Sequence, residues 1–129
     1  MKKYLIALFL LLVPIISYAH DMVPTYPVLR PSYMAGVLVT EIELFNKRND
    51  VEYYEIAVFD KDFGPVPFVS SFKIFKLEYL KKVKVEIYIR EQDKDRAVYV
   101  CSRSRAPESE KVNINTGITS MICSKFKRN

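Results

Sequence analysis

The feature that most constrains this chain is a strict alternation of apolar and polar residues. From Lys82 to Arg90 every second residue is Val or Ile, and the residues between them are charged or Tyr. Successive side chains of a β-strand point to opposite faces, so this pattern predicts a strand with one buried face. The segments from Val37 to Leu44 and from Tyr54 to Val58 alternate in the same way, whereas helix periodicity is nowhere convincing.

Turn signals divide the chain into short strands. Polar residues, or Asp with Gly and Pro, follow the predicted strands at Asn46 to Asp50, at Asp60 to Pro65 and at Glu91 to Asp95. The remaining predicted strands are Val28–Tyr33, Phe72–Leu77, Ala97–Ser102 and Val112–Phe126. About seven short strands with a turn roughly every eight to twelve residues is the spacing of an immunoglobulin-like β-sandwich. The sequence therefore predicts one all-β domain, a single seven-stranded immunoglobulin-like sandwich.

The first nineteen residues have the pattern of a secretory signal. Two lysines precede an apolar run from Leu5 to Ile16, and Ser17 and Ala19 are small residues at the positions that a signal peptidase inspects. We therefore expect cleavage after Ala19, which leaves residues 20–129 as the exported domain. The apolar run is too short to cross a bilayer comfortably and no second run follows, so we expect no membrane insertion after cleavage.

The net charge gives no indication of a nucleic-acid partner. The whole chain has a formal charge of +5, and losing Lys2 and Lys3 with the leader leaves +3. The basic residues are interspersed with Asp and Glu, as on an ordinary solvated surface, and no basic stripe or aromatic platform accompanies them. We expect no nucleic-acid binding.

Cys101 and Cys123 are the only cysteines. An even number of cysteines in an exported chain predicts a single disulfide, because the compartments outside the cytoplasm are oxidising. Two alternatives stay open at this point. The cysteines could be two free buried thiols, or a metal pair, although two sulfurs without a nearby His do not complete a zinc site.

Four short motifs occur in a characteristic order. The first is Arg30–Gly36, which contains an Arg, a Tyr and a Gly and is followed ten residues later by Asn46. The others are Phe75–Glu78, Asp95–Val100 and Ala106–Lys111. In order and spacing these motifs resemble the amino-terminal domain of the periplasmic pilus-assembly chaperones, the PapD-like family, over nearly all of the mature chain. The resemblance implies a PapD-like sandwich in the periplasm.

The resemblance also implies a function. Such chaperones lend a β-strand to an unfinished pilus or surface-appendage subunit, so that main-chain hydrogen bonds give affinity and apolar side chains fill the subunit's groove. Arg30 falls on the family's Arg, which with a Lys anchors the subunit's terminal carboxylate. Lys125, beside the position that matches the family's Lys, is the candidate here. The groove-filling candidates are Ile114 and Ile118.

The resemblance has two departures and one further implication. The family's donor positions fall on Asn115, Gly117 and Thr119, which are poor groove fillers, whereas Ile114 and Ile118 have the other parity. A one-residue slip would exchange the two faces, so the sequence does not decide which set points outward. The family continues into a second sandwich domain where this chain ends at Asn129. A disulfide between the last two strands occurs in some members, and the pair of cysteines would form one here.

Catalysis is not expected, because His20 is the only His and no set of Ser, His and acid can be built around it. We accordingly expect no catalytic residues, no metal site and no cofactor. One alternative is that His20, as the mature amino terminus, binds copper through its amine and imidazole. The simpler interpretation is an incidental His at a flexible terminus. A structural immunoglobulin-like component of a surface or secretion assembly is the other alternative function.

Overall fold

The computed structural model describes residues 19–105 and 120–128. In order along the chain its elements are β1 (Asp21–Val23), β2 (Arg30–Pro31), β3 (Val37–Phe45), β4 (Tyr53–Phe59), β5 (Val69–Ser70), β6 (Ile74–Lys76), β7 (Lys82–Arg90), the 3-10 turn η1 (Glu91–Asp93), β8 (Tyr99–Arg105) and β9 (Met121–Lys125). In these two stretches no helix is long and apolar enough to cross a membrane. The predicted leader and the predicted groove fillers Ile114 and Ile118 lie outside the described residues.

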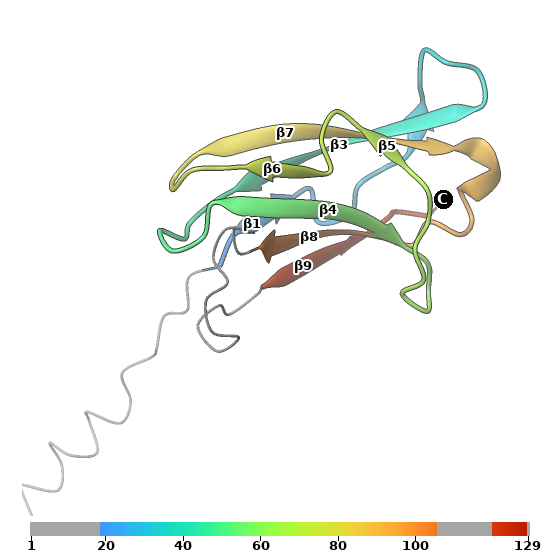
Figure 1. The fold of residues 1–129 in the computed structure, drawn as a ribbon. Helices are drawn as coiled ribbons and strands as arrows, with labels where there is room; N and C mark the ends of the chain where they lie inside the picture. Colours follow the sequence, from blue (N-terminus) through green and yellow to red (C-terminus); the bar gives the residue numbers. More distant parts are fainter. Residues whose placement is uncertain (1–18, 106–119, 129) are drawn as a thin grey trace, which may run out of the picture.

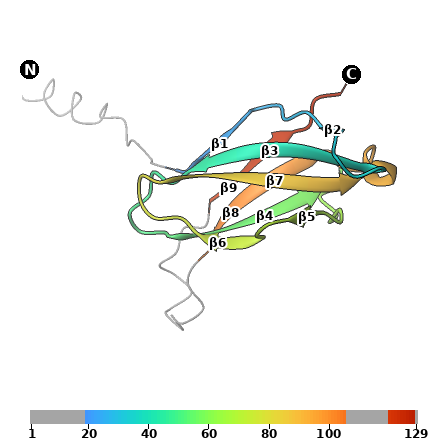
Figure 2. The same ribbon diagram turned by 90° about the horizontal axis from the view of Figure 1, so that it is seen from above.

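The strands form two antiparallel sheets that pack face to face (Figure 1). One sheet has the order β1, β3, β7, β5, with β2 also pairing with β3, and the other has the order β6, β4, β8, β9. Seen from above, β3 and β7 run side by side over the layer that contains β4, β8 and β9 (Figure 2). The predicted all-β, immunoglobulin-like sandwich is confirmed.

The longest pairing in the molecule joins β3 to β7, with Val37 opposite Arg90 and Phe45 opposite Lys82. The alternation in both sequences sends Ile42 and Leu44 of β3 and Ile87 and Ile89 of β7 into the core, where each is almost fully buried. Burying one such side chain stabilises a fold by about 2 kcal/mol. The predicted inward faces of these strands are therefore correct.

The second sheet supplies the opposite wall of the core. Tyr54, Ile56 and Val58 of β4 and Val100 of β8 are buried against the first sheet. The two strands pair from Tyr53 opposite Arg105 to Phe59 opposite Tyr99. This predicted inward face of β4 is also correct.

Several strand predictions need correction, and the described residues contain nine strands rather than the predicted seven. The predicted strand Val28–Tyr33 is reduced to the two residues of β2, and the predicted Val112–Phe126 lies partly outside the described residues. The three-residue β1 and the two-residue β5 were not predicted, because so few residues give no alternation signal. β8 is longer at its carboxyl end than the predicted Ala97–Ser102 and begins later. Its inward residues there are Ser102 and Ser104, which are buried although they are polar. A strand with buried serines does not show the apolar alternation on which the prediction depended.

The first segment of the chain lies along the edge between the two sheets. β1 pairs with β3, and after it the chain passes β9, where the amide of Lys127 donates to the carbonyl of Pro27 at 2.9 Å. The chain then returns to β3 as β2, with Arg30 opposite Val39. The amino-terminal segment therefore contacts both sheets, and it holds the end of the last strand.

Candidate functional site

β9 is an edge strand with one unpaired side. Among the described residues it pairs with β8 alone, and the amide of Phe126, just beyond the strand, donates to the carbonyl of Val98 at 2.9 Å. Hydrogen-bonding direction alternates along an antiparallel pair, so the odd-numbered residues of β9 direct their N–H and C=O groups away from β8. These residues are Met121, Cys123 and Lys125. In the described part of the chain no strand pairs with this side of β9. The first segment of the chain nevertheless runs near it: β1 lies close to β9, and the amide of Lys127, two residues beyond Lys125 on the same side, donates to the carbonyl of Pro27.

The structure fixes which face of the strand is inward for the described part of β9. Ser124 and Phe126 are buried and Ile122 is half-buried, whereas Met121 and Lys125 are exposed. Even-numbered side chains therefore point into the sandwich and odd-numbered ones point to solvent from residue 121 onward. The sequence alone left this open, because a shift of one residue exchanges the two faces.

The predicted disulfide joins Cys101 of β8 to Cys123 of β9. The two residues lie directly opposite each other in the ladder, with Cα atoms 4.1 Å apart. Both are odd-numbered and lie on the face opposite to the inward, even-numbered residues of these strands; Cys101 is buried there and Cys123 is exposed. The disulfide holds β9 against β8 at the middle of β9, so it restrains the strand without using its free side.

Arg30 lies on β2, on the other sheet, and is exposed. It borders a hollow of about 470 Å³, whose lining also includes Tyr26, Val39, Glu41 and Glu86. None of the ion pairs in the described part of the chain involves Arg30. An exposed guanidinium can bind a carboxylate in two-pronged geometry, although Glu41 and Glu86 of the same hollow would oppose an anion placed inside it.

Arg30 and Lys125 are not in direct contact. They belong to different sheets, and no hydrogen bond or ion pair in the described residues joins them. Both nevertheless lie towards the same end of the sandwich, because Arg30 is level with Tyr88 near the end of β7 and Lys125 is opposite Tyr99 at the start of β8. The two cations therefore lie towards one end of the domain without contacting each other.

The chain beyond β9 is held by Arg128, which sequence reasoning missed. Its guanidinium donates to the carbonyl oxygens of Lys94, Asp95 and Ala97 at 2.9, 3.2 and 2.7 Å. No sequence pattern marks a basic residue near a chain end as a cap for a distant loop. This contact fixes the Lys125 end of the candidate strand.

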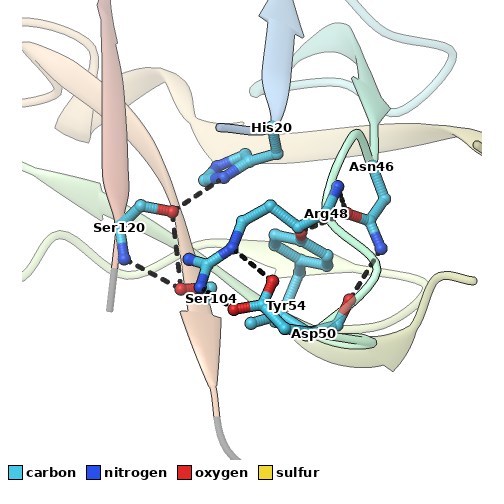
Figure 3. Close-up of polar contacts among 8 residues, drawn as sticks. His20, Asn46, Arg48, Asp50, Tyr54, Ser104 and Ser120 are labelled. Carbon is cyan, nitrogen blue, oxygen red and sulfur yellow. Dashed lines mark hydrogen bonds and ion pairs between the residues drawn. The ribbon is translucent and has the colours of Figure 1, made fainter. Parts of the chain in front are cut away.

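A cluster of polar side chains closes the opposite end of β9, and sequence reasoning also missed it (Figure 3). His20 is only 1% exposed, which contradicts the interpretation of a flexible terminus. Its Nε2 lies 2.8 Å from the hydroxyl of Ser102 and its Nδ1 lies 3.2 Å from that of Ser120. The ring also packs at 4.8 Å, centroid to centroid, on Tyr54. Both ring nitrogens are therefore engaged, so neither is free for the copper site considered above.

Asn46 is the centre of the same cluster on the side of β3. Its amide nitrogen donates to the carbonyls of Val51 and Leu77 at 2.7 and 2.9 Å. Its oxygen accepts from the amide of Arg48 at 2.8 Å and from the hydroxyl of Tyr54 at 2.7 Å. This buried side chain has all of its hydrogen-bonding capacity used, which makes it a structural residue.

An ion pair between an Arg and an Asp lies at the solvent-exposed edge of the cluster. Arg48 is largely buried and binds the exposed Asp50 through Nη2 at 2.6 Å. This contact lowers the pKa of Asp50 and raises that of Arg48. Burial raises the pKa of Tyr54 to about 12 and lowers that of His20 below its ordinary value of 6.5. The buried His20 and Tyr54 side chains are therefore both held in their neutral forms at neutral pH.

The sandwich, the crossing first segment and the disulfide-bonded edge strand define an immunoglobulin-like fold of the PapD-like type. Among solved structures, the chain is similar to the E. coli chaperone DraB, with a TM-score of 0.64 and 18% sequence identity. The similarity covers 84% of this chain and 53% of the other, so this chain spans about half the length of DraB. The PapD-like resemblance predicted from the motifs is thus confirmed at the level of the fold.

The sequence comparisons add nothing to this. No family model matches the chain, and no curated protein matches it.

Proposed function

We propose that this protein is a chaperone of the periplasm that binds another exported protein by pairing a strand with β9. The observation that carries the proposal is the unpaired side of β9, with the outward backbone groups of Met121, Cys123 and Lys125. An extended segment that pairs there gains main-chain hydrogen bonds without disturbing the β8 ladder. The similarity in fold to the chaperone DraB supports the same interpretation.

The partner we propose is an incomplete subunit of a pilus or surface appendage. Arg30 and Lys125 would bind its terminal carboxylate, and Ile114 and Ile118 would fill its open groove. The exposure of Arg30 and of Lys125 at one end of the domain is compatible with this role. The leader would be removed after Ala19, so residues 20–129 would act as one domain.

We also propose that binding involves no catalysis and no cofactor. The single His of the chain is buried, and both of its ring nitrogens are near serine hydroxyls. Its pKa is lowered by burial, which leaves it neutral and enclosed rather than facing a substrate.

A backbone variant tests strand pairing directly. The N–H of Lys125 points away from β8, so Lys125→Pro removes an outward donor and leaves the ladder intact. Lys125→Ala is the matched control, because it removes the side-chain charge and keeps the N–H. Tagged mature protein is captured from periplasm, and the bound protein is identified by mass spectrometry. We expect a one-to-one complex with an exported subunit that is lost in Lys125→Pro and only weakened in Lys125→Ala.

Arg30 provides an independent arm of this experiment. We expect Arg30→Ala to lose the complex and Arg30→Lys to retain part of it, because Lys keeps the charge but not the two-pronged geometry. Finding no complex, or equal capture by Lys125→Pro and wild type, would contradict the proposal. Recovery of the protein in a polymer at the cell surface instead would favour a structural component of the assembly.

A further inference from the structure

His20, at the amino end of the domain, contacts the residue that leads into the last strand. Ser120 is the residue immediately before β9, and its hydroxyl lies 3.2 Å from Nδ1 of His20. His20 comes directly before β1 and is, after the predicted cleavage, the first residue of the mature chain. Its Nε2 lies 2.8 Å from the hydroxyl of Ser102 of β8, so a single ring contacts both β8 and the residue that leads into β9.

Ser120 also bonds to Ser104 of β8. Its amide donates to the hydroxyl of Ser104 at 2.8 Å, and its carbonyl accepts from the amide of Ser104 at 2.9 Å. Two serines, Ser104 and Ser120, therefore form the pair at which the β8 and β9 ladder begins, and their hydrogen-bonding groups face each other. His20 covers these atoms and is itself supported by Tyr54.

We propose that His20 is a positioning residue: by contacting both Ser120 and Ser102, its ring fixes where the last strand begins. This inference rests on the proposed lending of β9. A strand already ordered in its binding conformation pays no ordering cost when a partner pairs with it. With Arg128 at the far end and the disulfide in the middle, His20 completes three restraints along β9.

The charged groups around His20 decide how this contact responds to acid. Arg48, from the segment between β3 and β4, opposes a positive imidazole, and it is paired there with Asp50. The carboxylate of Asp21, on β1, favours a positive imidazole, but it is already paired with the ammonium of Lys47 at 2.6 Å. Tyr54, on β4, is neutral. A protonated His20 would therefore be buried beside a cation, and we expect acid to release the start of β9.

The experiment measures amide hydrogen exchange of the mature protein, residue by residue, by NMR. The reporters are the amides of Ile122 and Ser124, which face β8, and the amide of Ile87 in the other sheet is the control. We expect His20→Ala to speed exchange of the two reporters by about tenfold and to leave Ile87 unchanged, as for the loss of about one hydrogen bond. Ser120→Ala is the second variant, for the case in which His20→Ala does not fold.

Two further readouts distinguish positioning from general stability. His20→Asn can place a side-chain donor or acceptor near Ser120 but does not titrate, so we expect it to restore slow exchange. After correction for the chemical rate, wild-type reporters should exchange faster as the pH falls from about 7.5 to about 5.5, and those of His20→Asn should not. Uniform acceleration in both sheets, or no acceleration in either His20→Ala or Ser120→Ala, would overturn the inference.

The failure of this inference and that of the proposed function give different results. Exchange is measured without a partner, so localised release of β9 with no captured subunit would contradict the function and leave the positioning role standing. A captured subunit that dissociates at the wild-type rate from His20→Ala, together with unchanged exchange, would contradict only the positioning role.

Discussion

The imidazole of His20 lies 2.8 Å from the hydroxyl of Ser102, although 82 positions separate them in the chain. This contact joins the first residue after the predicted leader to β8, the strand that also carries one half of the disulfide. Around it, Asn46, Arg48 and Tyr54 form a buried polar layer at one end of a core that is otherwise apolar. Polar groups in such a layer stabilise the fold only while all of them keep their partners.

Asn46→Ala should lower the free energy of unfolding by about 3 kcal/mol, because it removes the bonds to the buried carbonyl of Leu77, the part-buried carbonyl of Val51 and the buried hydroxyl of Tyr54. Urea denaturation of the mature protein measures the change. Asn49→Ala is the matched control, since Asn49 is exposed in the same loop. A loss no greater than that of the control would show that water replaces these contacts.

Replacing both Cys101 and Cys123 by Ser should lower the free energy of unfolding by about 3 kcal/mol, the cost expected for opening a loop closed across a sequence separation of 22. Denaturation under non-reducing conditions measures this. Thiol titration of the unfolded, unreduced wild type should find no free thiol. Two titratable thiols would contradict the disulfide.

The stability should fall in mild acid because of His20. Above its ordinary pKa of 6.5 the ring is neutral in both folded and unfolded protein. As the pH falls below that value, the imidazole is protonated in the unfolded chain before it is protonated in the folded one, because burial lowers its pKa in the folded state. The folded state therefore loses stability as the pH falls. We expect the free energy of unfolding to decrease between about pH 7.5 and about pH 5 in wild type and to decrease less in His20→Asn.

Asp50 should act in a separate and lower pH range. Its contact with Arg48 lowers its pKa below 3.8, so the stability it contributes is present above that value and is lost as the pH falls through the folded pKa. Asp50→Asn should therefore flatten the loss of stability below about pH 4 and leave the His20 range unchanged. An identical slope in the variant and wild type below that pH would contradict this assignment.

Leader removal should come before the amino end docks. His20, on the carboxyl side of the predicted scissile bond, is buried, and a peptidase must bind that residue in an accessible, extended form. We expect folded precursor to resist signal peptidase in detergent, and the same precursor carrying His20→Ala to be cut faster. Cleavage of folded and urea-unfolded wild-type precursor at equal rates would contradict this order.

The sequence predicted the parts of the fold that depend on local alternation. Val83 to Ile89 and Tyr54 to Val58 each contain enough successive residues for the period of two to appear, and both strands have the predicted faces. The predicted disulfide followed from the number of cysteines and from export. β5 and the serine-containing end of β8 were not predicted correctly. Two residues are too few to show an alternation, and buried serines have the polarity expected of solvent-exposed positions.

By itself, the sequence determined an all-β sandwich, the inward residues of its long strands and a pair of cysteines able to bond. Only the tertiary structure decided that Ser124 and Phe126 point inward, that His20 is buried, and that within residues 19–105 and 120–128 β8 alone pairs with β9. The physical reason is the range of the interactions. Alternation is a property of neighbouring residues, whereas the partners of His20 and of Cys101 are fixed by strand register between segments far apart in the chain.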